Sequence, residues 1–174
     1  MDRTDGLLRL ALEEDIGSGD VTTLSVIPSD QRADAVVFGR ERFVLSGAAV
    51  FRGIFELIEP EVQTQSLFQD GELVEAGAIV FKLEGPARAL LTGERTALNF
   101  LQRLCGIATL SRVMTDAISG TSCRLLDTRK TTPIWRGFEK AAVKHGGGLN
   151  HRFGLFDGIL IKDNHIAAAG GVSE

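Results

Sequence analysis

Five side chains in the last third of the chain are of types that bind anions or transfer protons. They stand in three short stretches: Arg129 and Lys130 in DTRKTTP, His151 and Arg152 in GGGLNHR, and Lys162 in GILIK. Arginine grips a carboxylate or phosphate with two parallel hydrogen bonds, whereas lysine presents a compact point charge. Each also has an ordinary explanation, because a lone lysine is usually a surface charge and a histidine is more often structural than catalytic. Their concentration predicts a site for an anionic small molecule.

The charge of the chain is unevenly distributed. Residues 124–165 hold eight Lys/Arg and four Asp/Glu, a net charge of +4, although the whole chain has a formal net charge of −4. One basic segment in a mildly acidic protein favours a local anion site over a nucleic-acid surface, which would show basic stripes interleaved with aromatics. The presence of one Trp and no Tyr weakens that alternative further.

Other classes of protein find little support in the sequence. No run of about eighteen apolar residues occurs, so we expect no transmembrane helix, and the start MDRTDGLLRL lacks the features of a signal peptide. No G-x-S-x-G elbow is present. Cys105 and Cys123 form no metal-ligand pattern and lie in apolar surroundings, which argues against a reactive thiolate. We expect a reduced, cytoplasmic protein.

The first half of the chain has the pattern of an α+β unit made of short antiparallel elements. The expected elements are helices over 6–14 and 48–58 and strands over 33–40, 43–47, 61–69 and 78–85. A long amphipathic helix is expected over 87–105, ended by Gly106 and followed by a second helix over 107–118. Arg95 falls on the polar side of the long helix, which suggests a solvated face. An acidic cluster is expected to cap and solvate rather than to bind a metal, and it comprises Glu13, Glu14, Asp15 and Asp20.

The second half has the pattern of a strand–helix–strand unit. The apolar runs 123–127 and 158–162 are typical of strands buried in a parallel sheet. A helix is expected between them, from Pro133, with Thr132 as its N-cap, to about His145. Because the carboxyl ends of parallel strands share one edge, the distant cations would meet at one mouth, beside the positive end of the helix. The sequence therefore predicts a binding site for a strongly anionic small molecule at that mouth.

Four stretches resemble, in this order, the quinolinate phosphoribosyltransferase family, also called the carboxylating nicotinate-nucleotide pyrophosphorylases. They are EEDIGSGDVTT, GERTALNFLQRLCGIAT, LLDTRKTTP and KHGGGLNHRFGLFDGILIKDNHI. The resemblance covers essentially the whole chain, and the last two stretches are specific. It implies an α+β open-faced sandwich domain over residues 1–105, with a linking helix over 87–105, and then the first part of an incomplete α/β barrel over residues 106–174.

The resemblance also implies an enzyme, a pentosyltransferase. Its members join quinolinate to phosphoribosyl pyrophosphate and release pyrophosphate and carbon dioxide, which gives nicotinate mononucleotide for de novo NAD biosynthesis. Both substrates are polyanions, in agreement with the anion site. Homodimers or larger homo-oligomers are implied, as is Mg²⁺ accompanying the pyrophosphate, with its ligands expected downstream of Glu174.

Site residues carry over by motif. The quinolinate pocket is implied to be lined by Thr128, Arg129, Lys130, His151, Arg152 and Lys162. Arg95, in GERTALN, is implied to reach into the active site of the partner subunit, which replaces the solvated-face interpretation. Decarboxylation leaves a carbanion that must be protonated, and Lys130 and Lys162 are both candidate catalytic acids.

Two features depart from the family pattern. Ile134–Trp135 stands where Gly-Leu is expected after TTP, which is expected to alter the start of the helix. The chain also stops where another helix is expected to begin, so we expect a truncated chain that is inactive by itself. The alternatives to the enzyme are a non-catalytic anion-binding or assembly module and a molybdenum-transport relative of the same superfamily.

Overall fold

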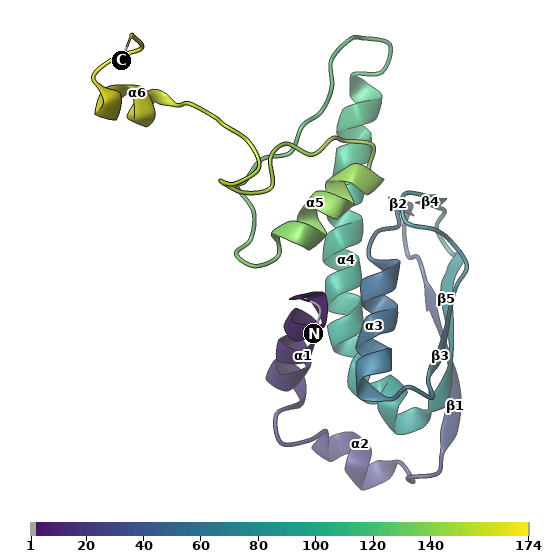
Figure 1. Ribbon diagram of the computed structural model, residues 1–174. Helices are drawn as coiled ribbons and strands as arrows, with labels where there is room; N and C mark the ends of the chain where they lie inside the picture. The colour runs from purple at the N-terminus through teal and green to yellow at the C-terminus, as the bar shows by residue number, and fades with distance from the viewer. Residues whose placement is uncertain (1–2, 174) are drawn as a thin grey trace.

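The computed structural model describes residues 3–173, and its first half is a sheet with helices packed on one face (Figure 1). Three antiparallel strands run in the order β1-β5-β3, and a second, two-stranded sheet pairs β2 with β4. The elements of this half are α1 (Arg3–Ile16), α2 (Val21–Val26), β1 (Arg32–Phe38), β2 (Phe43–Val44), α3 (Ala48–Ile58), β3 (Gln63–Ser66), β4 (Leu73–Val74), β5 (Ile79–Pro86) and α4 (Ala87–Ala117).

The core lies between the sheet and α3. Phe51 on α3 stacks on Phe81 of β5 with ring centroids 4.3 Å apart, and both side chains are buried. Burying an aromatic side chain of this size contributes about 1.5–3 kcal/mol. Gly47 precedes α3 with a φ of +99°, and a Cβ there would meet the Leu104 side chain at 2.7 Å, so only glycine fits this approach of α3 to α4.

Most elements predicted for the first half are confirmed. The helix over 48–58 has the predicted bounds, and the strands predicted over 33–40 and 78–85 agree with β1 and β5 to within two residues. The short helix α2 was not predicted. Asp20, one of the four acidic residues expected to cap and solvate, accepts a hydrogen bond from the backbone N–H of Thr23 at 2.9 Å and caps α2, which confirms its capping role.

The helix α4 corrects the prediction of two helices separated at Gly106. It is continuous from Ala87 to Ala117, 31 residues, and therefore about 46 Å long. A single glycine costs a helix only about 1 kcal/mol relative to alanine. Packing outweighs that cost, because Leu104 and Ala108 are buried on either side of Gly106. The proposed domain division after residue 105 falls inside α4 and stays a prediction.

The two strands predicted for the second half do not form in the described chain. Only an isolated parallel bridge links Leu126 to Leu149, through Asp127 N–H to Leu149 O at 3.0 Å and Leu149 N–H to Leu125 O at 2.8 Å. Residues 158–162 have no strand beside them, and Ile159 is 95% exposed. A buried parallel strand requires neighbours at its edges and cover on its faces. The two apolar runs have the composition of buried strands, but among the described residues no strand pairs with either of them.

The remaining helices are α5 (Arg136–His145) and α6 (Asp163–Ala169). The first packs against α4, whereas α6 stands apart at the end of an extended segment (Figure 1). α5 ends at the predicted residue but begins three residues later than Pro133, and Thr132 is not its N-cap. Ile134 has a φ of +61°, which is incompatible with a right-handed helix, so the helix cannot include it.

Candidate anion-binding site

Asp127 holds together the two basic stretches that lie far apart in the sequence. Its Oδ1 accepts hydrogen bonds from Lys140 Nζ on α5 at 2.5 Å and from the backbone N–H of His151 at 2.8 Å. The Asn150 amide, in the orientation that satisfies its neighbours, donates to Asp127 Oδ2 at 3.1 Å. Together with the bridge at Leu126, these bonds place Thr128 beside His151.

Arg136 ties the same two stretches together from the start of α5. Its Nε donates to Thr131 Oγ1 at 3.1 Å, its Nη2 to Arg129 O at 3.5 Å and its Nη1 to Phe153 O at 3.0 Å. The guanidinium also lies 6.0 Å from the centroid of the Phe153 ring. Residues 129–131 and residue 153 are therefore linked through one side chain.

A third support comes from α4. Arg103 Nη2 donates to Thr132 Oγ1 and to Glu139 Oε1, both at 2.7 Å. Trp135 stacks on Phe100 of α4 with ring centroids 4.4 Å apart and planes 4° from parallel. Burial raises the pKa of the Glu139 carboxyl, but the hydrogen bonds from Arg103 and Thr132 lower it more, and the net pKa lies below its usual value.

Of the predicted residues in DTRKT, Thr128 and Lys130 are exposed and Arg129 is half-buried. Thr128 Oγ1 accepts a hydrogen bond from the Lys130 backbone N–H at 3.0 Å, which turns the chain sharply after Asp127. The Nε of Arg129 is buried and is one of two buried side-chain polar atoms without a partner among the described residues. A buried cationic donor without an acceptor is costly, and an anionic ligand would satisfy it.

His151 and Arg152 lie beside this loop. The His151 side chain is exposed, and its Nδ1 accepts a hydrogen bond from the Arg152 backbone N–H at 2.7 Å. A neutral imidazole that accepts at Nδ1 carries its proton on Nε2, which is then oriented to donate. Arg152 Nη1 donates to Gly158 O at 2.8 Å, so its remaining N–H groups stay available. Bonds through Asp127 and Arg136 thus bring the backbone of residues 127–129 close to that of residues 151–153.

Lys162 is not brought to this neighbourhood. It is exposed, it precedes α6, and its backbone N–H donates to His165 Nδ1 at 2.9 Å. α6 is the element that stands apart in Figure 1. The predicted catalytic role of Lys162 stays a prediction.

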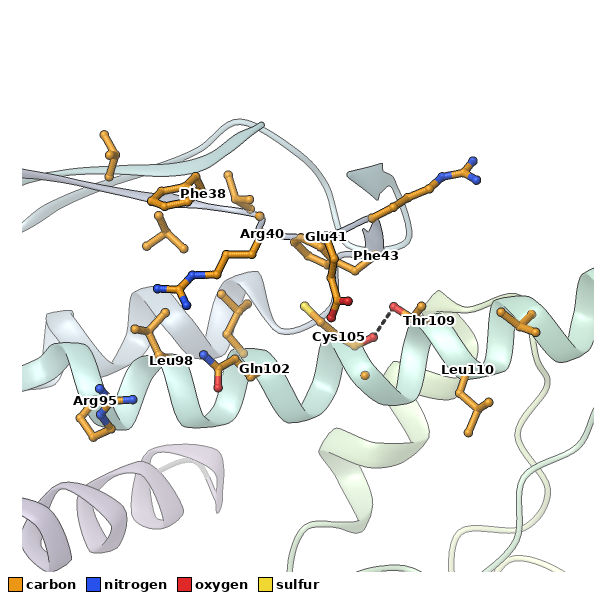
Figure 2. Close-up of a pocket in the computed structure, with 18 residues that line it drawn as sticks. Phe38, Arg40, Glu41, Phe43, Arg95, Leu98, Gln102, Cys105, Thr109 and Leu110 are labelled. Carbon is orange, nitrogen blue, oxygen red and sulfur yellow. Dashed lines mark hydrogen bonds between the residues drawn. The ribbon is translucent and has the colours of Figure 1, made fainter. Parts of the chain in front are cut away.

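Arg95 lies on the exposed side of α4 and lines a different hollow. This groove, of about 910 Å³, runs between α4 and the chain from β1 to β2, and Figure 2 shows Arg95, Gln102 and Arg40 along it. Arg95 and Arg40 form no ion pair with the described residues. The predicted reach of Arg95 into a partner site stays a prediction, and its exposure agrees with that role.

Sequence reasoning missed the acidic residues that build the site. Lys140 counts toward the basic segment, but it is buried and paired with Asp127, so it adds no free positive charge. The role of Glu139 was not predicted. The sequence did contain a signal for these roles, because Glu139 and Lys140 fall on the buried side of the amphipathic helix α5, where charged side chains need partners.

Residues 3–173 show neither a metal-ligand cluster nor a membrane-spanning helix. No group of three or more His, Cys, Asp or Glu in this range could hold a metal ion. Within the same range, no helix is long and apolar enough to cross a membrane.

Two family models match the chain. The model described as quinolinate phosphoribosyl transferase, N-terminal domain, matches residues 20–105, and the model described as its C-terminal domain matches residues 107–174. Among curated proteins, the chain is 46% identical to the probable carboxylating nicotinate-nucleotide pyrophosphorylase of Bacillus subtilis (strain 168), over 92% of this chain and 55% of that protein. It is 45% identical to the chloroplastic carboxylating nicotinate-nucleotide pyrophosphorylase of Arabidopsis thaliana, over 95% of this chain and 47% of that protein.

Solved structures agree with these matches. NadC from Streptococcus pyogenes superposes with a TM-score of 0.93 at 45% identity, over 97% of this chain and 60% of that one. The nicotinate-nucleotide pyrophosphorylase from Francisella tularensis gives a TM-score of 0.94 at 42% identity, over 99% of this chain and 61% of that one. These likenesses confirm the fold class, an open-faced sandwich followed by the first part of a barrel domain. The chain spans about half the length of the curated relatives it matches.

Proposed function

Because the chain belongs to the quinolinate phosphoribosyl transferase family, we propose that it supplies the quinolinate-binding part of a phosphoribosyl transfer reaction. The reaction joins quinolinate to phosphoribosyl pyrophosphate and yields nicotinate mononucleotide, pyrophosphate and carbon dioxide for NAD biosynthesis. The protein then acts as a carboxylating nicotinate-nucleotide pyrophosphorylase in the cytoplasm, as a homodimer or larger homo-oligomer.

The observation that carries the proposal is the junction built on Asp127. It ties the backbone of His151 to Asp127, the residue before Thr128 and Arg129. The Nε of Arg129 is buried without a partner among the described residues, and His151 accepts at Nδ1 from the Arg152 backbone N–H. Quinolinate carries two adjacent carboxylates on a flat ring, and such a ligand needs several donors fixed in one orientation. Arginine and imidazole N–H groups held by backbone bonds supply that arrangement.

The roles follow from the chemistry of each side chain. Arg129, His151 and Arg152 bind and orient the two carboxylates. Lys130, which is exposed beside them, is the candidate to protonate the carbon that loses its carboxylate, and Lys162 remains the other candidate. Arg95 would complete the site of a second copy.

The residues present do not fit the Mg²⁺ ion that this chemistry uses with pyrophosphate. Mg²⁺ prefers carboxylate and water oxygens in octahedral geometry. Residues 3–173 contain no suitable cluster, and Asp127 is already committed to Lys140 and to His151. Mg²⁺ therefore stays a proposal for the whole protein.

Calorimetric titration of quinolinate into the chain tests the binding half of the proposal. Arg129→Ala and Lys130→Ala should each weaken binding about tenfold or more, because each removes a charged contact. Lys82→Ala is the matched control, since Lys82 is an exposed lysine on β5, and it should leave binding unchanged. Nicotinate lacks the second carboxylate, and if it bound as tightly as quinolinate the substrate assignment would be wrong.

The catalytic half is tested separately by following pyrophosphate release from phosphoribosyl pyrophosphate. Release that requires quinolinate supports the enzyme. The second candidate function is the non-catalytic anion-binding module, which is favoured by the position of Lys162 away from the other cations. Quinolinate binding without pyrophosphate release would support that module for this chain.

A further inference from the structure

Glu139 and Arg103 form a closed triangle with the residue that ends the TRK loop, defined as residues 128–132. We propose that Glu139 and Arg103 are positioning residues that hold this loop in its anion-binding conformation. The inference rests on the proposed function for the identity of the ligand, but the geometry of the triangle does not depend on it. Neither residue contacts the ligand in this proposal, and both act through Thr132.

The carboxylate of Glu139 uses both of its oxygens within the triangle. Oε1 accepts from Arg103 Nη2 and from Thr132 Oγ1, each at 2.7 Å, and Oε2 accepts from the Thr132 backbone N–H at 3.1 Å. Arg103 Nη2 also approaches Thr132 Oγ1 at 2.7 Å. The Glu139 side chain is only 11% exposed, so the three bonds that it accepts are partly shielded from water, whereas the Arg103 side chain is 51% exposed.

The triangle fixes the loop at the end opposite to Asp127. Asp127, the residue before the loop, is anchored by Lys140, and Thr132, the last residue of the loop, is anchored by Glu139. Lys140 and Glu139 are neighbours on α5, so the two ends of the loop are clamped by one turn of helix. Arg129 and Lys130 lie between these anchors, and their positions therefore depend on both.

Ile134 and Trp135 show how firmly the Thr132 end of the loop is held. Ile134 adopts a φ of +61°, a conformation that a β-branched residue avoids, and such strain persists only where neighbouring contacts over-determine the backbone. Trp135 supplies one of these contacts by stacking on Phe100, and Arg103 lies 5.8 Å from the Trp135 ring centroid. The clamp is thus built from α4 as well as from α5.

A surface ion pair would be the ordinary interpretation of Arg103, whose side chain is 51% exposed. Such pairs contribute little by themselves. Glu139 distinguishes a positioning pair from an ordinary surface ion pair, because it is buried and accepts a hydrogen bond from a backbone N–H of the loop. The loss of its charge should therefore release the loop, whereas the loss of a surface carboxylate should not.

Trypsin cleavage tests the clamp without any ligand, because the loop contains two trypsin sites, after Arg129 and after Lys130. Glu139→Gln should raise cleavage at these sites about tenfold relative to the wild-type chain, since the loop opens locally once its charged bonds are gone. Cleavage after Arg40, in the exposed β1–β2 connection, should not change. Glu56→Gln, which removes a surface carboxylate paired with Arg52 at 3.6 Å, is the matched control and should alter neither site.

Quinolinate binding gives the second readout, and the single tryptophan, Trp135, reports it by fluorescence. Glu139→Gln should raise the dissociation constant about tenfold, and Thr132→Val, which keeps the backbone N–H, should have a smaller effect in the same direction. Arg103→Met combined with Glu139→Gln should weaken binding little more than Glu139→Gln alone, because both act on one contact.

The outcomes separate the two proposals. If the wild-type chain does not bind quinolinate, the proposed function fails, and the trypsin comparison still decides the clamp. Unchanged cleavage after Arg129 and Lys130 in Glu139→Gln overturns the clamp, and so does an equal increase at every site, which would indicate general destabilisation. Unchanged quinolinate binding in a Glu139→Gln chain that binds in its wild-type form overturns the positioning role. If Glu139→Gln fails to fold, Thr132→Val carries both measurements.

Discussion

Replacing Lys140 with methionine separates a buried ion pair from the backbone bonds that share its acceptor. Lys140 Nζ lies 2.5 Å from Asp127 Oδ1, and the two side chains are 3% and 6% exposed. Methionine preserves most of the apolar stem but removes the ammonium. Asp127 then keeps the bond from the His151 N–H, at 2.8 Å, as well as its charge, but loses the cation that compensates it.

The expected cost follows from burial. Removing one partner of a buried pair typically destabilises a protein by about 3–5 kcal/mol, because the other charge is left without compensation. In a chain of this size, each kcal/mol lowers the melting temperature by about 2–4 °C, so Lys140→Met should lower it by about 6–20 °C. Asp127→Asn should cost a similar amount. The double variant should cost at least about 2 kcal/mol less than the sum, since it leaves no unpaired charge.

Urea unfolding followed by the fluorescence of Trp135 and by circular dichroism measures these free energies, provided that the two probes give coincident transitions. Glu75→Gln is the control, because Glu75 pairs with Arg42 at 3.1 Å on the surface, with side chains 69% and 64% exposed. It should cost about 0–1 kcal/mol. Additive costs in the double variant, or a Lys140→Met cost no larger than that of the control, would refute the reasoning.

Single residues carry three further predictions. The Ile134→Gly variant should be about 1 kcal/mol more stable than the Ile134→Ala variant in urea unfolding, because alanine keeps a Cβ at a φ of +61°. The order should reverse at Gly137, which lies inside α5 with open space where a Cβ would stand, so Gly137→Ala should stabilise the chain by a similar amount. The lowered pKa of Glu139 adds stability that is present above its ordinary value of 4.5 and is lost as the pH falls through the folded-state pKa, so Glu139→Gln should flatten the acid limb of stability against pH. A thiol reagent at pH 8 should modify exposed Cys123 in the native chain and spare buried Cys105, whose pKa burial raises to about 11; two rapidly reacting thiols before unfolding would contradict this.

The features that sequence predicted well depend on residues close together in the chain. The bounds of α3 follow from apolar residues at helical spacing, among them Val50, Phe51 and Ile54, all on one buried face. The strands β1 and β5 likewise agree with the short runs predicted over 33–40 and 78–85. Such patterns need no knowledge of what lies opposite.

The features that were missed depend on distant partners. Lys140 looks like any helical lysine until Asp127, 13 residues away, is brought against it. Arg103 and Glu139 are separated by 36 residues, and nothing local marks them as a pair. The run 158–162 signalled a strand because its apolar composition suits a buried sheet, yet a strand forms only where a neighbouring strand supplies hydrogen bonds. Sequence therefore singled out the basic residues proposed for the site, whereas the acidic residues that bond to the same stretches, Asp127 and Glu139, were not predicted to do so.

The continuity of α4 has a consequence for how this chain can change in length. The helix begins within residues 20–105, matched by the N-terminal family model, and ends within residues 107–174, matched by the C-terminal one. An extra residue inserted at Gly106 would turn the downstream half by about 100° and advance it by about 1.5 Å. Thr115 would then leave Gly146, to which it donates at 2.9 Å. The helix thus fixes the rotation of one half of the chain relative to the other. We therefore expect insertions to be tolerated in the loops but not inside α4.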